Sequence, residues 1–328
     1  MHFPQVLVLG ATGRIGRILQ VCWANGAERI VPRWQTRQVV GQVVDQVVDQ
    51  TSGQASGMPA VMPPVMPPVL PPVTPAARTG GQGVRVDPLA DPDGLARAAA
   101  GCDVILCLSG VVPGRGPEGG TGDLEDNTRL ALSAIRAGQA VGARVLLASS
   151  AAVYGNQTGR LGEDTPLRPT TDYGLAKAEM ETRAQALGRD LGVAVCALRI
   201  GNIAGVDVIL GGWAPGFRLD QFADGHTPRR SYIGVSTLAR VLGDLVATQA
   251  PLPAALNIAG PGVTEMGALL DAAGLAWIPR PAPETAIARV ALDVSALQRV
   301  CRIAPETGDP AQLVAEWALL EPELNILT

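Results

Sequence analysis

A glycine-rich segment near the start of the chain constrains its fold more than any other feature. It reads Gly10-Ala-Thr-Gly13-Arg-Ile-Gly16, follows the apolar run 6–9 and leads into residues 15–23, which can form a helix. The run is typical of a buried parallel strand, so the order is strand, glycine turn and helix. Glycines here allow positive φ and close approach of a pyrophosphate, while the helix N-terminus offers N–H groups to the anion. We therefore expect a dinucleotide to contact Gly10, Thr12, Gly13, Arg14, Ile15 and Gly16; a purely structural turn is the alternative.

Apolar runs and helical segments continue to alternate after this turn. Strands are predicted at 28–34, 84–87, 103–110, 143–150 and 193–199, and helices at 93–100, 126–141 and 173–191. This order favours an α/β fold with a doubly wound parallel sheet, the Rossmann arrangement. Ligands bind such sheets at the carboxyl ends of the strands, where the glycine turn also lies.

The chain is long enough for two lobes. Its 328 residues exceed what one hydrophobic core usually serves. We assign residues 1–205 to a dinucleotide-binding domain, to which 231–250 returns, and residues 206–230 and 251–328 to a smaller substrate-binding lobe. We expect the five large aromatic residues of this second half to fill its core; for Trp213 and Phe217 the alternative is that they line a pocket. The five are Trp213, Phe217, Phe222, Trp277 and Trp317.

A low-complexity stretch interrupts the first domain at residues 38–82. It contains a repeated Gln-Val-Val pattern, followed by Met-Pro-Pro-Val repeats. Prolines at this spacing continue neither a helix nor a central strand, so polyproline II or coil is expected. We predict an insertion that loops out of the domain; a docking segment for a proline-recognising partner is the alternative.

Charge and composition exclude several classes of function. The net charge of -4 and the pI near 5.3 argue against binding to nucleic acid or to an anionic membrane. Two histidines and five cysteines show no metal-ligand spacing, so we predict no metal site, and the odd number of cysteines indicates buried free thiols. No signal-like segment and no membrane-length apolar run stand out, so a cytoplasmic location is expected.

A tyrosine and a lysine in the helix predicted at 173–191 suggest acid–base chemistry. Tyr173 and Lys177 are four positions apart, so they share one face of a helix. An ammonium near a phenol stabilises the phenolate, so we expect Lys177 to lower the pKa of Tyr173. Ser150 ends the strand predicted at 143–150 and is placed to bind a substrate oxygen. These three residues suit hydride chemistry at a C–OH/C=O centre, although a Tyr-x-x-x-Lys spacing alone also arises by chance.

The end of the second strand bears on the choice of dinucleotide. In dinucleotide folds an acid at this point binds the 2'-hydroxyl of NAD, and an arginine accommodates the 2'-phosphate of NADP. Arg33 stands there, followed by Arg37, and no acid is present. The expected cofactor is therefore NADP, with NAD as the alternative, and Arg14 is a second candidate for the phosphate. Two solvated surface arginines are the other interpretation.

Five motifs occur in the order known from one family. After the glycine turn come Ser149-Ser-Ala-Ala-Val-Tyr-Gly155, Glu163-Asp-Thr-Pro166 with Tyr173-Gly-Leu-Ala-Lys177, Leu198-Arg-Ile-Gly-Asn-Ile-Ala-Gly205, and Arg230-Ser-Tyr-Ile233. The chain thereby resembles the extended short-chain dehydrogenase/reductases, the NAD-dependent epimerase/dehydratase group that includes UDP-glucose 4-epimerase. The resemblance covers nearly the whole chain except residues 38–82.

The resemblance implies roles for individual residues. Ser150, Tyr173 and Lys177 match the catalytic set, in which Tyr173 and Lys177 also contact the cofactor, the lysine at the nicotinamide ribose. Asn202 and Arg230 match substrate contacts, the arginine at a sugar-nucleotide diphosphate, although a surface arginine is the alternative. Asn127 is a further candidate, either near the cofactor or only at a helix start. Two positions depart from the family pattern: Arg33 stands where NAD-binding epimerases carry aspartate, and Ala151 and Ala152 stand where dehydratases carry Asp-Glu.

The predicted function is that of an NAD(P)-dependent oxidoreductase or epimerase acting on a small molecule, either a sugar nucleotide or a small carbonyl compound. The segment between Gly205 and Arg230 is shorter than in epimerases, which leaves the fit of a full UDP-sugar open. An NADPH-dependent reductase of small carbonyl compounds is one alternative. A non-catalytic, cofactor-sensing protein on the same fold is another. The resemblance also implies a homodimer through the helices that start near Asp126 and Tyr173.

Overall fold

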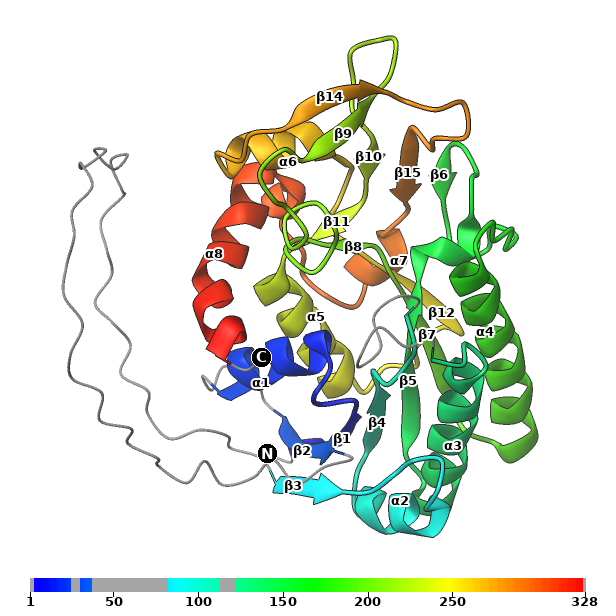
Figure 1. Ribbon diagram of the computed structural model, residues 1–328. Helices are drawn as coiled ribbons and strands as arrows, with labels where there is room; N and C mark the ends of the chain where they lie inside the picture. Colours follow the sequence, from blue (N-terminus) through cyan, green and yellow to red (C-terminus); the bar gives the residue numbers. More distant parts are fainter. Residues whose placement is uncertain (1–2, 25–29, 37–81, 113–121, 327–328) are drawn as a thin grey trace, which may run out of the picture.

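The computed structural model describes residues 3–24, 30–36, 82–112 and 122–326. The insertion predicted at 38–82 lies outside these residues except for Gln82. The large lobe is built on one parallel sheet with the order β12-β7-β5-β4-β1-β2-β3 (Figure 1). Its strands are β1 (Gln5–Leu9), β2 (Val31–Thr36), β3 (Gln82–Arg85), β4 (Val104–Cys107), β5 (Arg144–Ser150), β7 (Val195–Ile200) and β12 (Ala255–Ile258).

Helices cover both faces of this sheet, as the alternating order predicted. They are α1 (Arg14–Ala24), α2 (Pro92–Ala99), α3 (Asp126–Val141), α4 (Asp172–Leu191) and α5 (Val235–Ala247). One buried cluster joins α1 and α5 to side chains such as Val6 and Val8. The opposite face of β1 presents Leu7 and Leu9 to the cluster formed with α2, α3 and α4. Because every other residue of a strand points to the same face, one apolar run fills two cores. The predicted α/β fold is confirmed.

A smaller group of elements stands above the carboxyl ends of the strands (Figure 1). A mixed sheet has the order β13-β10-β15-β6, and β11 and β14 pair with β8 and β9 respectively. The strands are β6 (Arg160–Leu161), β8 (Asn202–Ile203), β9 (Arg218–Gln221), β10 (Arg229–Arg230), β11 (Tyr232–Ile233), β13 (Thr264–Glu265), β14 (Ile278–Pro281) and β15 (Arg289–Leu292). The helical elements are η2 (Ala151–Tyr154), α6 (Met266–Ala272), α7 (Ser295–Gln298), η3 (Pro305–Gly308) and α8 (Pro310–Ile326).

The boundary between the two groups differs from the sequence-based division. Residues 251–328 were assigned to the smaller lobe, yet β12 is the edge strand of the large sheet, where Leu256 pairs with Leu198 of β7. The terminal helix α8 also packs against α1 and α5 as well as α6. The last quarter of the chain therefore contributes to both groups of elements.

Local signals fix the helix that carries Tyr173 and Lys177. Thr171 caps α4, because its hydroxyl accepts a hydrogen bond from Gly174 N at 3.1 Å. Gly192 ends the helix with φ of 67°, a left-handed conformation that glycine adopts without strain. A Cβ on Gly174 would lie only 2.6 Å from Ala152 O, so this glycine lets α4 approach η2 closely. Tyr173 and Lys177 are thereby placed in the first two turns, beside the end of β5.

The described residues contain all five cysteines of the chain. The cysteines Cys102, Cys107, Cys196 and Cys301 are buried and Cys22 is partly buried, all as free thiols, which agrees with the sequence-based expectation. In the described part of the chain, no group of three or more His, Cys, Asp or Glu side chains could hold a metal ion. None of the helices described has the length and apolar character needed to cross a bilayer.

Candidate active site

The glycine turn between β1 and α1 has little room for side chains. Gly10 has φ of 82°, and a Cβ there would lie 2.7 Å from Ser109 N. A Cβ on Gly16 would collide with the carbonyl oxygens of Gly10 and Ala11. Gly13 is less crowded, with its nearest neighbour, Gly10 O, at 3.3 Å. The turn therefore exposes backbone at the N-terminus of α1, which fits a pyrophosphate.

A buried glutamine that the sequence analysis missed supports this turn. The Gln35 side chain accepts a hydrogen bond from Gly10 N at 3.0 Å and donates one to Val86 O at 2.7 Å. It is 2% exposed and ties the glycine turn to the ends of β2 and β3. A polar residue at the carboxyl end of a strand beside the turn is the signal that could have found it.

The structure does not bring Arg33 to the glycine turn. Arg33 pairs with Leu7 in the sheet, three residues before Gly10. Its guanidinium donates to Ala98 O at 2.5 Å and to Ala100 O at 3.0 Å, where a cation stabilises the end of α2. It lines a separate hollow at the β3–α2 edge. The predicted contact with a 2'-phosphate is therefore corrected: β2 extends to Thr36, and Arg33 is not at its end.

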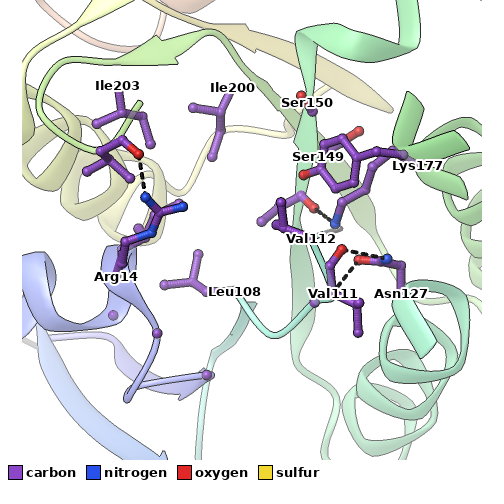
Figure 2. Close-up of a pocket in the computed structure, with 18 of the residues that line it drawn as sticks. Arg14, Leu108, Val111, Val112, Asn127, Ser149, Ser150, Lys177, Ile200 and Ile203 are labelled. Atoms are coloured by element: carbon purple, nitrogen blue, oxygen red, sulfur yellow. Dashed lines mark hydrogen bonds between the residues drawn. The ribbon is translucent and has the colours of Figure 1, made fainter. Parts of the chain in front are cut away.

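The glycine turn forms one wall of a cavity of about 590 Å³, whose opposite wall carries the predicted catalytic residues (Figure 2). The ends of β4, β5 and β7 form its floor. The cavity brings together Gly10, Thr12, Gly13, Arg14, Ile15, Gly16, Asn127, Ser150, Tyr173, Lys177 and Asn202 from the sequence-based set. Residues that the sequence analysis did not select also line it, among them Leu108, Val111, Val112, Ile200, Val206 and Asp207.

Ser150, Tyr173 and Lys177 form one cluster. The Tyr173 hydroxyl hydrogen-bonds to the Ser150 side chain. The Lys177 ammonium lies 5.8 Å from the centre of the Tyr173 ring and donates to Ala148 O at 2.9 Å. Lys177 is 4% exposed, so its aliphatic stem is enclosed and its ammonium is held at a fixed position.

The pKa of Tyr173 moves in the direction opposite to the sequence-based expectation. Burial raises the pKa of the phenol, although the Ser150 hydrogen bond and the charge of Arg14 act against the rise. Burial also lowers the pKa of Lys177 to about 8. Desolvation disfavours the charged form of both groups; it outweighs the effects of Ser150 and Arg14 on the pKa of Tyr173, and those of Cys107 and Glu181 on the pKa of Lys177. The expectation of a lowered pKa for Tyr173 is therefore wrong, and Lys177 is not among the groups that shift it.

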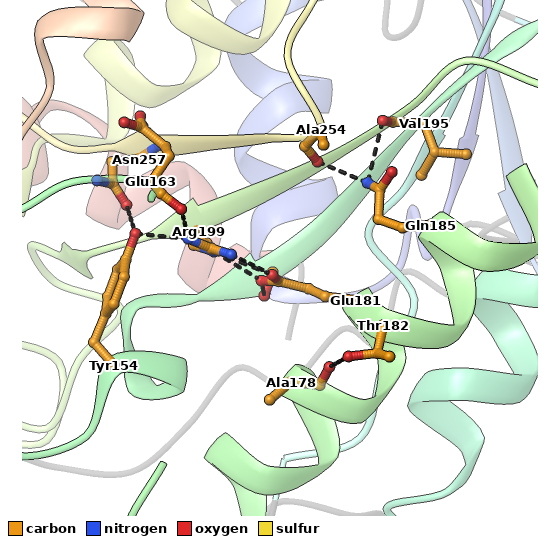
Figure 3. A network of polar contacts seen from close by, with 11 residues as sticks. Tyr154, Glu163, Ala178, Glu181, Thr182, Gln185, Val195, Arg199, Ala254 and Asn257 are labelled. Atoms are coloured by element: carbon orange, nitrogen blue, oxygen red, sulfur yellow. Dashed lines mark hydrogen bonds and ion pairs between the residues drawn. The ribbon is translucent and has the colours of Figure 1, made fainter. Parts of the chain in front are cut away.

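A buried polar network lies behind this cluster (Figure 3). Glu181 forms an ion pair with Arg199 at 2.8 Å and accepts a hydrogen bond from Ser149 Oγ at 2.5 Å. Arg199 also donates to Tyr154 OH at 2.9 Å, and that hydroxyl donates to Asn257 Oδ1 at 2.8 Å. Burial alone would lower the pKa of Arg199, but Glu181 outweighs it and raises that pKa. Glu181, one helical turn after Lys177, was not selected from the sequence.

Asn127 lies in the first turn of α3, at the edge of the cavity. It is buried, and its side chain accepts from Val111 N at 3.2 Å and donates to Val111 O and Leu124 O, both at 3.1 Å. It also lines the cavity. Asn127 therefore fixes the segment after β4 against the helix start, at the edge of the site (Figure 2).

The model of one protein family matches residues 6–209, more than half of the chain: the NAD dependent epimerase/dehydratase family. The chain belongs to this family. The membership confirms the predicted family and the predicted class of function, an oxidoreductase or epimerase of the extended short-chain type. A search of curated proteins found no match.

Solved structures with the same fold agree with this assignment. A UDP-glucuronic acid 4-epimerase from Bacillus cereus, in complex with UDP-glucuronic acid and NAD, is 17% identical with a TM-score of 0.67, covering 97% of this chain and 99% of that one. A Thermus thermophilus UDP-glucose 4-epimerase complex with NAD is 19% identical with a TM-score of 0.64, at 96% and 99% coverage. MoeE5 in complex with UDP-glucuronic acid and NAD is 21% identical with a TM-score of 0.67, also at 96% and 99%. At these identities the likeness shows the fold.

The two predicted substrate contacts of this epimerase/dehydratase family member are placed differently. Asn202 lines the cavity and hydrogen-bonds to Asp207, which accepts from Tyr232 OH at 2.6 Å. Burial raises the pKa of Asp207. Arg230 is not among the residues that line the cavity; it donates to Arg229 O at 2.8 Å, and burial lowers its pKa. The structure therefore brings Asn202, but not Arg230, to the other site residues.

Proposed function

We propose that this chain catalyses NAD-dependent hydride chemistry at a C–OH/C=O centre of a small molecule, with Tyr173 as the acid–base residue. One observation carries the proposal: the hydrogen-bonded Ser150 and Tyr173, with Lys177, share a cavity with a glycine turn in which Gly10 and Gly16 have no room for a side chain. The clustering of a hydroxyl, a phenol and an ammonium opposite an anion-binding turn supports a catalytic role over a non-catalytic one.

A bound nicotinamide dinucleotide would donate or accept the hydride. Ser150 would hold the substrate oxygen by a hydrogen bond, and Tyr173 would exchange a proton with that oxygen. The raised pKa keeps the phenol protonated, so it is ready to donate to a developing alkoxide. Lys177 would bind the nicotinamide ribose from its position beside the phenol. Because η2 presents Ala151 and Ala152 after Ser150, we do not propose dehydration by side chains at those positions.

For the nicotinamide cofactor we propose NAD before NADP. Arg33 is bound to the end of α2 and supplies no reason for a 2'-phosphate, and the similar structures were solved with NAD. Arg37, the other arginine of this segment, lies outside the described residues. Arg33→Ala is expected to leave the ratio of NADH to NADPH affinity unchanged. A change in that ratio for Arg33→Ala, with Arg37→Ala as the parallel variant, would overturn the placement of Arg33.

Two measurements test the proposed function. NADH should raise the melting temperature of the purified protein, because a ligand that binds only the folded state stabilises it. A screen of UDP-glucose, UDP-glucuronic acid, small ketones and small aldehydes, followed by cofactor absorbance and by product analysis, then separates the two outcomes. A reductase consumes NADH in proportion to product, whereas an epimerase forms product without net consumption. If neither NADH nor NADPH shifts the melting temperature, the proposal fails.

We also propose a homodimer that forms through α3 and α4, and a cytoplasmic location. The support for both is the resemblance to extended short-chain enzymes, and for the dimer also the contact between α3 and α4, which places them as one surface. Sedimentation velocity at micromolar protein concentration tests the dimer: a purely monomeric species would contradict it.

A further inference from the structure

A second cavity, of about 660 Å³, lies next to the catalytic cavity. It is lined by α1, α8, the residues that follow α6 and the segment 205–213, and we call it the α1–α8 chamber. Figure 1 shows α8 beside α1 and reaching α6. The chamber and the catalytic cavity share three lining residues, Arg14, Arg17 and Val206. The two cavities therefore adjoin at these residues, and a molecule with its reacting carbon near Tyr173 reaches the chamber by passing Arg14 and Val206, which are hydrogen-bonded to each other.

The walls of the chamber are apolar and held in place. Trp213 and Trp317 both line it, and Trp213 Nε1 donates to Ala276 O at 2.9 Å, which fixes the indole ring. Gly205, with φ of 82°, allows the Trp317 ring to lie directly on the backbone, because a Cβ there would collide with that ring. Of the two pocket candidates from the sequence, Trp213 lines the chamber, whereas Phe217 only packs into the small core. Most other lining side chains are aliphatic: Ile18, Val206, Leu210, Ala273, Leu275, Val314 and Ala318.

Positive charge is concentrated where the two cavities meet. Arg14 donates from Nη1 to Val206 O. The Arg17 guanidinium is half-buried and makes no hydrogen bond or ion pair with any other described side chain or backbone group. Glu321, on α8, is the one carboxylate among the described residues that line the chamber. A partly desolvated guanidinium with no partner in the described chain is suited to bind an anion.

We propose that the α1–α8 chamber holds an aromatic, anionic part of the substrate, with the ring against Trp213 and Trp317 and a carboxylate, sulfonate or phosphate on Arg17. Aromatic rings gain from offset or edge-to-face packing on indole, and apolar walls favour a ligand part that needs few hydrogen bonds. A sugar nucleotide fits this chamber less well. The polar side chains lining it are Arg14, Arg17 and Glu321, which would leave most ribose and base groups without partners. The proposal rests on the proposed function only in naming the occupant as substrate.

The test uses 8-anilinonaphthalene-1-sulfonate, an aromatic sulfonate whose fluorescence rises in apolar surroundings, with the full-length protein. We expect one saturable site per chain. Arg17→Gln should weaken binding by about tenfold or more, because a charge-assisted contact is lost. Ala318→Phe should weaken it similarly by filling the chamber. The matched controls are Arg136→Gln on α3 and Leu319→Phe, at a position of α8 that is 70% exposed, and both should bind as the unchanged protein does.

Each result decides one question. Equal binding by the unchanged protein, Arg17→Gln and Ala318→Phe would overturn the chamber as the site. Displacement of the probe by UDP-glucose, with a UDP-glucose affinity that itself depends on Arg17, would overturn the aromatic class in favour of a nucleotide. The NADH-induced rise in melting temperature is measured on the same samples. Its absence, with probe binding retained, would remove the proposed function and leave the chamber standing.

Discussion

The two walls of the catalytic cavity are built on different principles. The glycine wall comes from seven consecutive residues and depends on two positions without side chains, because Gly10 and Gly16 have no space for a Cβ. The opposite wall depends on the side chains of Ser150, Tyr173 and Lys177, which come from β5 and α4. Contacts from remote parts of the chain, including Asn257 on β12, support that wall. One wall is therefore sensitive to added volume and the other to changed charge.

The two walls also differ in the kind of polar group that they contain. At the glycine turn, Gly10 and Gly16 contribute only backbone, whose polarity does not change with pH. Behind the catalytic residues, the ion pair of Glu181 and Arg199 is 6% and 8% exposed and is satisfied by further hydrogen bonds. A buried pair of this kind is costly to break from one side only.

The largest effect is expected at the phenol. Tyr173→Phe removes the proton that the catalytic wall exchanges and keeps the ring beside Lys177, so turnover should fall by about 10²–10⁴-fold. The protein should still fold and NADH should still raise its melting temperature, because the change removes one hydrogen bond, to Ser150, and leaves the glycine turn intact. Steady-state kinetics on a substrate from the screen measure the change, and unaltered turnover would remove Tyr173 as the acid–base residue.

Breaking the buried pair should come next. Glu181→Gln leaves the Arg199 charge without its carboxylate, and the free energy of unfolding should fall by about 3–5 kcal/mol. Glu179→Gln is the matched control on the same helix: its pair with Arg183, at 3.9 Å, is exposed, and its loss should cost about 0.5 kcal/mol or less. Urea denaturation of both variants measures the difference. Equal losses would show that the network behind the site does not stabilise the fold.

A methyl group added to the glycine wall should lower stability and NADH affinity more where the neighbouring atoms lie closer. Gly16→Ala places a methyl group against two carbonyl oxygens and should cost about 1–3 kcal/mol of stability, together with most of the NADH affinity. Gly13→Ala, whose nearest contact would be at 3.3 Å, should have a smaller effect on both. NADH titration by fluorescence, with chemical denaturation, separates affinity from stability. The reverse order of the two variants would contradict the crowding seen at Gly16.

The smallest effect should be a pH dependence from Lys177. Because burial lowers its pKa from 10.5 to about 8, folding disfavours the charged form. The cost is fully present below about pH 8 and is relieved as the pH rises toward the unfolded value. Lys177→Met removes the charge, so its stability relative to the unchanged protein should be highest near neutral pH and should decline by about pH 10. A difference that is constant, or that grows with pH, would contradict the lowered pKa of Lys177.

The glycine wall could be predicted from the sequence because it is local. A strand, a glycine turn and a helix follow one another, and this order identifies Gly10, Gly13 and Gly16 as the turn. The second strand was expected at 28–34 but is β2 at Val31–Thr36, and this shift moved Arg33 from the strand end to the middle. Strand ends depend on pairing with neighbours, which a single segment does not reveal.

The catalytic wall could be predicted only in part. Tyr173 and Lys177 share one helix, and the ordered motifs added Ser150. The predicted direction of the pKa shift of Tyr173 was wrong, because the shift depends on burial by distant segments. The partnership of Glu181 with Arg199 joins α4 to β7, and no sequence spacing connects them. Similarly, β12 is only four residues long, and the pairing of Leu256 with Leu198 is a tertiary property.

The hydrogen bond from Arg14 to Val206 O has a consequence for how two ligands affect each other's binding. It connects the first turn of α1 to the segment that leads into the smaller group of elements, so the two sides of the junction are mechanically joined. A ligand that binds on one side and breaks or strengthens this hydrogen bond would alter the affinity of the other side for its own ligand. Thermodynamic reciprocity then requires that the dinucleotide and the second molecule change each other's dissociation constants by the same factor.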